Sequence, residues 1–122
     1  MHQSPRILSW RWGRLRVETA RQPLRDAVLF PGGVRGWDWR DSGTDHRTGI
    51  QPSAVREVLE HGARIVILSS GVLGALNVAP ETLELLAEKG VAVEVLRTPA
   101  AIERYNTLAA TEPVGALIHS TC

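Results

Sequence analysis

The sequence has a single cysteine, Cys122, and no long run of apolar residues. One cysteine excludes a disulfide within the chain and a zinc site built from several cysteines, and it is typical of a reducing compartment. The longest apolar stretches, such as residues 65–68, are far shorter than a membrane span, and residues 1–12 lack the apolar core of a signal peptide. We therefore expect a cytoplasmic protein that makes no membrane contact.

The sequence also lacks a strong net charge, internal repeats and linkers. Its formal net charge is +1, with 43% hydrophobic and 22% charged residues, which is typical of one globular domain in a chain of 122 residues. The charge is uneven, because residues 1–50 carry nine arginines against five acidic residues. We interpret this as a solvated arginine face on a sheet. Nucleic-acid binding is the weaker alternative, because the pI is moderate and no nucleic-acid motif is present.

Hydrophobic periodicity divides the chain near residue 50. In residues 1–50, alternating runs at 7–12, 15–18 and 27–30 predict antiparallel strands. In residues 51–122, predicted helices at 53–61, 80–89 and 99–110 alternate with predicted strands at 65–68, 91–96 and 114–118. These strands are nearly unbroken apolar runs, which indicates parallel strands covered on both faces. The predicted fold is a single α/β domain, residues 1–122, with a parallel β-α-β-α-β core at 51–122 and antiparallel N-terminal strands.

Two side chains of the last helix carry more specific predictions. Thr98 stands just before Pro99, where a threonine can act as the N-cap of a helix. Tyr105 lies on the apolar stripe of the helix, so we expect its ring to pack inward and its hydroxyl to remain at the edge.

Residues 30–40 combine turn residues, two tryptophans and three charges. Pro31-Gly32 predicts a type II turn, because proline fixes the first φ and glycine accepts a positive second one. If the chain then runs extended, Trp37 and Trp39 share one face while Asp38 and Arg40 share the other. The segment thus has an aromatic face and an ionic face.

Several short motifs together resemble the small adipogenesis-associated domain proteins, a family that also includes a mitochondrial factor for assembling respiratory complex I. The matching positions span nearly the whole chain: Pro31-Gly32-Gly33, Arg35, Trp37-Asp38-Trp39-Arg40, Gly43-Thr44, His46, Gly49, Gln51-Pro52, Tyr105-Asn106 and His119-Ser120-Thr121-Cys122. The resemblance implies a three-layer domain with a mixed central sheet and a second, small β layer. It implies no particular chemical activity.

The ends of the predicted parallel strands bring polar residues to one edge of the sheet, where open α/β sheets bind ligands. One hypothesis is a small-anion or small-ligand site in which backbone N–H groups of residues 69–74 face the ligand. Its candidate residues are Ser69, Ser70, Gly71, Thr98, His119 and Arg40. The alternative is a tight turn that needs a glycine. Because a phosphate-loop lysine and the dinucleotide glycine spacing are both lacking, we expect no cofactor.

The loop at residues 38–49 is polar enough to form a site, but no metal is expected there. Asp41, Asp45 and His46 have unconstrained spacing, and side-chain turns that hold the loop down are the simpler interpretation. We expect no catalytic residue. A carboxylate at the end of the sequence disfavours a thiolate at Cys122, neighbours His119 and Ser120 face opposite ways on a strand, and His46 has no evident partner.

The sequence leaves three functional hypotheses. The first is a non-enzymatic protein-interaction or assembly module that contacts its partner through Trp37, Trp39, Arg35, Asp41 and His46. The second is a ligand-binding domain or an unrecognised enzyme that uses the strand ends. The third and weakest is a nucleic-acid-binding domain.

Overall fold

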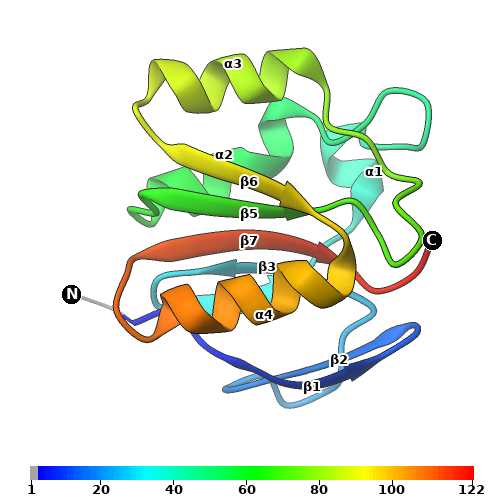
Figure 1. The fold of residues 1–122 in the computed structure, drawn as a ribbon, viewed down its shortest axis with the longest axis vertical. Coiled ribbons are helices and arrows are strands. Elements are labelled where there is room, and N and C mark those ends of the chain that lie inside the picture. The colour runs from blue at the N-terminus through cyan, green and yellow to red at the C-terminus, as the bar shows by residue number, and fades with distance from the viewer. Residues whose placement is uncertain (1–2) are drawn as a thin grey trace.

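A five-stranded mixed sheet forms the centre of the computed structural model, which describes residues 3–122 (Figure 1). The strand order is β4 (Gly33–Gly36), β3 (Asp26–Phe30), β7 (Val114–His119), β5 (Ile65–Ser69) and β6 (Ala92–Leu96). Strands β7, β5 and β6 are parallel, whereas β3 runs antiparallel to both β4 and β7. The predicted mixed sheet with a parallel core is confirmed, and the β3–β7 pairing joins the two halves of the chain.

Helices and a second β layer cover the two faces of this sheet (Figure 1). Helices α2 (Pro52–Glu60) and α3 (Pro80–Glu88) cover one face. Helix α4 (Thr98–Ala109) and the hairpin of β1 (Ile7–Arg11) and β2 (Arg14–Val17) cover the other. The three-layer arrangement is therefore confirmed. In the part of the chain that the structure describes, no helix combines the length and the apolar character needed to cross a membrane.

Each face of the sheet has its own hydrophobic core because strand side chains alternate between faces. In β3, Ala27 and Leu29 pack against the α4 side, while Val28 and Phe30 pack against the α2 side. Strands covered on both faces need apolar residues at every position, which is why β3, β5 and β7 read as continuous apolar runs.

Strand β6 departs from this rule. We predicted a strand covered on both faces at residues 91–96, and this is wrong, because β6 is the outermost strand of the sheet. Ala92 and Val95 are exposed, and Val95 keeps 44% of its surface in contact with solvent. The position of a strand within a sheet depends on its neighbours, which the run of residues 91–96 does not encode.

Two predictions about α4 are also wrong. Thr98 is the first residue of the helix rather than its cap, since Arg97 holds the N-cap position without a side-chain hydrogen bond. The hydroxyl of Tyr105 is fully buried and donates to the carbonyl of Pro5, because the segment leading into β1 covers the helix. This burial raises the pKa of Tyr105 well above its usual value.

The turn between β3 and β4 occurs where it was predicted, but the extended segment after it is shorter. Phe30 pairs with Gly33 across the turn, and Gly32 has a φ of +99°. The chain then forms a short helix, α1 (Trp39–Ser42), in place of the predicted extended segment up to residue 40. Asp38 starts this helix, because its carboxylate accepts a hydrogen bond from the backbone N–H of Arg40 at 3.0 Å.

Replacing Gly32 by valine is expected to lower the free energy of unfolding by about 1–2 kcal/mol, because a β-branched residue is forced to a positive φ. Thermal and denaturant unfolding measure the change. Gly36→Ala is the matched control in the same hairpin, since its added Cβ would lie 3.8 Å from Leu24, an ordinary contact. Equal stability of Gly32→Val and the wild type would contradict the turn assignment.

Candidate functional site

A buried aspartate and histidine meet at the edge of the sheet where β7 ends and β3 begins. Asp26 pairs with His119 in the antiparallel register, and Asp26 Oδ1 lies 2.9 Å from His119 Nδ1. Their side chains are 10% and 3% exposed, and the same carboxylate oxygen accepts the N–H of Ser120. Because a carboxylate only accepts hydrogen bonds, His119 carries a proton on Nδ1, and in the neutral ring Nε2 is an acceptor.

Three of the proposed ligand-binding residues come together here, because Ser69 and Thr98 contact the backbone of His119. Ser69 Oγ is 2.8 Å from Thr98 Oγ1, and the Thr98 hydroxyl donates to the His119 carbonyl at 2.5 Å. Ser69 and Thr98 are fully buried. Their hydroxyls therefore join β5, α4 and β7 to one another and do not face an open site.

Several of the backbone N–H groups proposed to bind an anion, those of residues 69–74, donate within the protein. Those of Ser70, Val72 and Gly74 donate to the carbonyls of Leu96, Thr121 and Gly71. Gly71 has a φ of +92°, and a Cβ there would lie 2.8 Å from the carbonyl oxygens of residues 121 and 122. The segment thus resembles the glycine turn that we gave as the alternative.

The charged residues proposed for binding are paired nearby. Arg40 forms an ion pair with Asp38 at 3.1 Å, and the hydrogen bonds from Arg40 lower the pKa of Asp38. Arg35 of β4 pairs with Glu57 of α2. Asp41 is exposed on α1. Arg35 and Arg40 therefore stabilise the surface around α1 and α2, which reduces the charge that they offer to a partner.

The two proposed contact tryptophans face into the protein. Trp37 is 7% exposed and packs in the α2-side core, and Trp39 is half-buried against it, with 5.7 Å between the ring centroids. Trp39 also covers His119, at 4.6 Å between ring centroids. Among the described residues, neither indole N–H finds an acceptor. Native proteins leave few buried polar groups unpaired, so the packing around Trp37 and Trp39 is not optimised for stability alone.

The polar loop before α2 is held down by Asp45. Its carboxylate accepts hydrogen bonds from the backbone N–H groups of Arg47 and Thr48 and from the Thr48 hydroxyl, and these bonds lower the pKa of Asp45.

The same loop brings His46 close to the last residue of the sequence. The distance between His46 Nε2 and Cys122 Sγ is 3.7 Å. Cys122 is therefore a partner of His46, and our expectation that His46 has none is wrong. The sequence did not indicate this contact, because the two residues are 76 positions apart. Residues 3–122 contain no group of three or more His, Cys, Asp or Glu side chains arranged for a metal.

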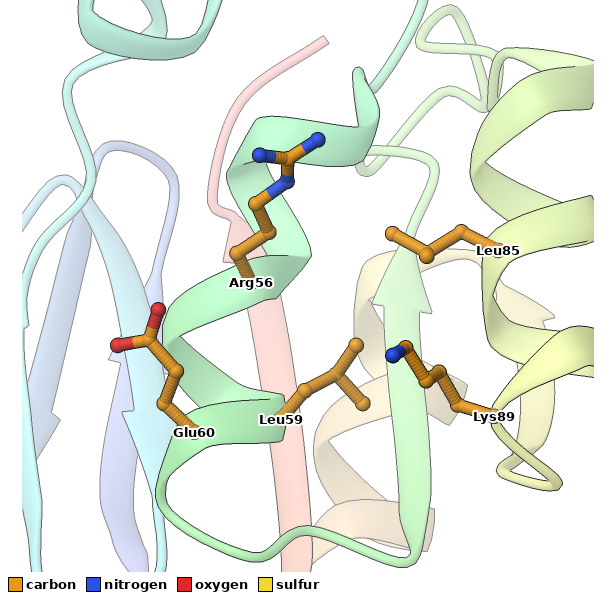
Figure 2. Close-up of a pocket in the computed structure, with 5 residues that line it drawn as sticks. All are labelled: Arg56, Leu59, Glu60, Leu85 and Lys89. Atoms are coloured by element: carbon orange, nitrogen blue, oxygen red, sulfur yellow. The ribbon is translucent and has the colours of Figure 1, made fainter.

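A separate groove of about 480 Å³ lies between α2 and α3, at the ends of these helices that precede β5 and β6 (Figure 2). Leu59 from α2 and Leu85 from α3 point into the gap, with Lys89 beside them, while Arg56 and Glu60 complete the lining. Sequence reasoning missed this groove, because its walls come from two helices whose spacing only the fold sets. It lies at the opposite end of the parallel strands from the Asp26–His119 pair.

The outer face of the β1–β2 hairpin is part of the arginine face that we predicted for residues 1–50, although none of its residues was proposed as a contact residue. Leu15 and Val17 point into the core, so the alternation of β2 sends Arg14 and Arg16 outward. Arg11 of β1 lies directly opposite Arg14. Beside them Leu8 is 59% exposed and Trp12, in the turn, is 56% exposed. The alternating pattern of residues 14–17 was the available signal, but it does not say which face remains open.

The fold and this edge of the sheet define a class of protein: a three-layer α/β domain with a mixed sheet, a small second β layer and a buried aspartate–histidine pair. The chain belongs to the family described as "Protein of unknown function (DUF498/DUF598)", whose sequence profile matches residues 7–119.

Solved structures share this fold. A conserved hypothetical protein from Pyrococcus horikoshii is 22% identical, with a TM-score of 0.79 over 96% of this chain and 99% of that one. The protein MT938 is 29% identical, with a TM-score of 0.73 over 97% and 99%. A Bordetella pertussis protein described as a Mth938-like domain is 17% identical, with a TM-score of 0.70 over 95% and 85%. This chain therefore has a Mth938-like fold.

Proposed function

We propose that this protein is a non-enzymatic docking module of the cytoplasm that binds an acidic partner protein through the outer face of the β1–β2 hairpin. The observation that best supports this proposal is that Arg11 and Arg14 lie directly opposite each other across the hairpin. Like charges directly opposite each other in an antiparallel pair destabilise it. A partner that brings carboxylates to this face neutralises that repulsion, so its binding stabilises the paired hairpin.

The charge of the hairpin region supports an acidic partner. Residues 3–25 contain six arginines and one glutamate, a net charge of +5, although the whole chain carries only +1. All six arginines are exposed, and none of their side chains has a hydrogen bond or ion pair within the described residues: Arg6, Arg11, Arg14, Arg16, Arg21 and Arg25. Arginine is well suited to carboxylates, since its planar guanidinium binds both oxygens at once.

Exposed apolar side chains favour a protein over a purely ionic ligand. Trp12 and Leu8 are more than half exposed and flank the arginines. A shallow groove of about 290 Å³ on this face is lined by Ser9, Trp10, Arg11, Arg14 and Arg16. Tryptophan and arginine are the side chains that most often dominate the binding energy of protein interfaces. The contact tryptophan is thus Trp12, in place of the buried Trp37 and the half-buried Trp39, because Trp10 lies opposite Leu15 and packs against the core.

An assembly role fits the resemblance to the adipogenesis-associated domain proteins, whose family includes a factor for assembling mitochondrial complex I. An assembly factor needs a surface that holds another subunit, and it needs no catalytic centre. The basic hairpin is such a surface, because it projects from the sheet as a separate layer (Figure 1).

An NMR titration tests the proposal. The probe is a short peptide of Asp, Glu and Phe residues, with a matched peptide in which Asn and Gln replace the acids. Chemical-shift changes are expected at residues 8–16 with the acidic peptide alone. Arg14→Glu should weaken its affinity by about tenfold or more, because a favourable charge pair becomes a repulsive one. Arg56→Glu, an exposed arginine on α2, is the control and should leave the affinity unchanged.

Two outcomes would overturn the proposal. Equal binding of the acidic and the neutral peptide would remove the charge argument. Tighter binding of a single-stranded oligonucleotide to the same residues would instead make the hairpin a nucleic-acid surface, since stacking on Trp12 and phosphate contacts use the same side chains.

A further inference from the structure

Three polar side chains continue the contacts beyond the buried Asp26–His119 pair. His119 Nε2 lies 3.3 Å from Thr121 Oγ1, and Thr121 Oγ1 lies 3.6 Å from Cys122 Sγ. On its other side, Cys122 Sγ lies 3.7 Å from His46 Nε2. A thiol is thus placed between a hydroxyl, which is anchored through one histidine, and the imidazole of a second histidine.

The backbone around the thiol is held in place from two directions. The carbonyls of Thr121 and Cys122 accept the N–H groups of Val72 and Ala75, at 3.1 and 3.2 Å. Trp39 and His46 make a T-shaped ring contact, with 5.2 Å between ring centroids, which orients that imidazole. The thiol and the imidazole therefore meet through two ordered segments. His46 is exposed and Cys122 is partly exposed, so a small reagent can reach the sulfur.

We propose that Cys122 is a nucleophilic thiol that exchanges with small disulfides, with His46 as the acceptor of its proton. Thiolates are the nucleophiles in such exchange, and an imidazole within hydrogen-bond reach generates them. The positive charge that His46 gains with the proton offsets the carboxylate at the end of the sequence, which by itself disfavours a thiolate at Cys122. The Thr121 hydroxyl donates its one proton to the acceptor nitrogen of His119, so its oxygen only contacts the sulfur, at 3.6 Å, and the thiol proton remains available to His46. Asp26 fixes the tautomer that makes this arrangement possible.

The exchange step is balanced within the pair of reactants. The thiol proton of Cys122 passes to His46 Nε2, and the sulfur attacks one sulfur of the reagent. A new S–S bond forms, the reagent's own S–S bond breaks, and its second sulfur leaves as a thiolate. The Cys122 sulfur is oxidised and the departing half of the reagent is reduced. The sequence contains no other cysteine, so no second thiol within it resolves the mixed disulfide.

The rate of reaction with Ellman's reagent tests the proposal directly, because Cys122 is the single cysteine of the sequence and the measured rate is therefore its own. The purified full chain should react about tenfold or more faster than N-acetylcysteine at the same pH, and His46→Gln should remove this advantage. His61→Gln, an exposed histidine stacked on Phe30, is the matched control and should keep the wild-type rate. Cys122→Ser provides the blank, and amide spectra check that each variant is folded.

A second measurement uses oxidised glutathione, followed by intact-protein mass spectrometry. A mixed disulfide at Cys122 that forms more slowly in His46→Gln is the expected result. The proposal is wrong if the wild type reacts no faster than N-acetylcysteine, if folded His46→Gln reacts at the wild-type rate, or if glutathione forms no adduct. None of these results depends on whether the β1–β2 hairpin binds an acidic partner.

Discussion

Replacing Asp26 with leucine is expected to lower the free energy of unfolding by about 3 kcal/mol or more, since it leaves two buried donors without an acceptor. These donors are His119 Nδ1–H and the N–H of Ser120, both bound to Asp26 Oδ1. They lie where the central strand β7 ends, so water reaches them poorly. Denaturant unfolding at neutral pH gives the change in free energy.

Asp26→Asn is the matched control, because its amide keeps one oxygen that can accept the N–H of Ser120. We expect it to cost about 1 kcal/mol, the contribution of one ordinary hydrogen bond. If leucine and asparagine destabilise the protein equally, the negative charge that both variants lose determines the cost, rather than the number of hydrogen bonds. If neither destabilises it, the aspartate–histidine pair does not hold the strand end.

Gly71→Ala is expected to cost about 2–5 kcal/mol, because two effects add at this position. The φ of +92° strains any residue with a Cβ, and that Cβ would lie 2.8 Å from the carbonyl oxygens of Thr121 and Cys122. The segment 121–122 must then move away from the turn at residues 71–75. Thermal unfolding measures the loss, and NMR shifts of Val72 and Ala75 report the broken hydrogen bonds.

Gly90→Ala separates the two effects. Gly90 has a φ of +69° but no atom within 4 Å of an added Cβ, so only the backbone strain of about 1–2 kcal/mol remains. We expect Gly71→Ala to be clearly the more destabilising of the two. Equal losses would show that segment 121–122 does not press on the turn, and would weaken the case for an ordered thiol at Cys122.

The hairpin and the thiol corner are connected in the structure. The backbone N–H of Gly13, in the β1–β2 turn, donates to the carbonyl of Ser120 at 3.1 Å. Trp12 is next to this contact and Cys122 is two residues beyond it. A partner bound to the hairpin face would therefore lie on an element that is tied to the segment after β7, which carries the cysteine. The two proposals remain separately testable, because one is measured as affinity and the other as a reaction rate.

Local sequence determined most of the elements of the fold. The prolines at 52, 80 and 99 stand in the first turns of α2, α3 and α4, because proline's missing N–H has no cost there. The predicted helices began at the second and third of these prolines and one residue after the first. The apolar runs predicted β5 and β7 to within one residue, and Pro31-Gly32 predicted the reversal between β3 and β4. These signals are reliable because each reflects the conformation of a few neighbouring residues. The prolines reflect a fixed φ and a missing hydrogen-bond donor, and the apolar runs reflect how strand side chains alternate between faces.

Only the tertiary structure decided what surrounds each polar group. Asp26 and His119 are 93 positions apart, and His46 and Cys122 are 76 apart, so no spacing in the sequence links them. The same holds for the burial of Trp37 and for the open face of Arg14. The sequence by itself determined most strands and helices and the turn, because these follow from short-range geometry, whereas the three-layer class was implied by the family resemblance. The thiol corner and the basic face depend on which surfaces meet when the layers pack, and that is set by long-range burial of apolar area.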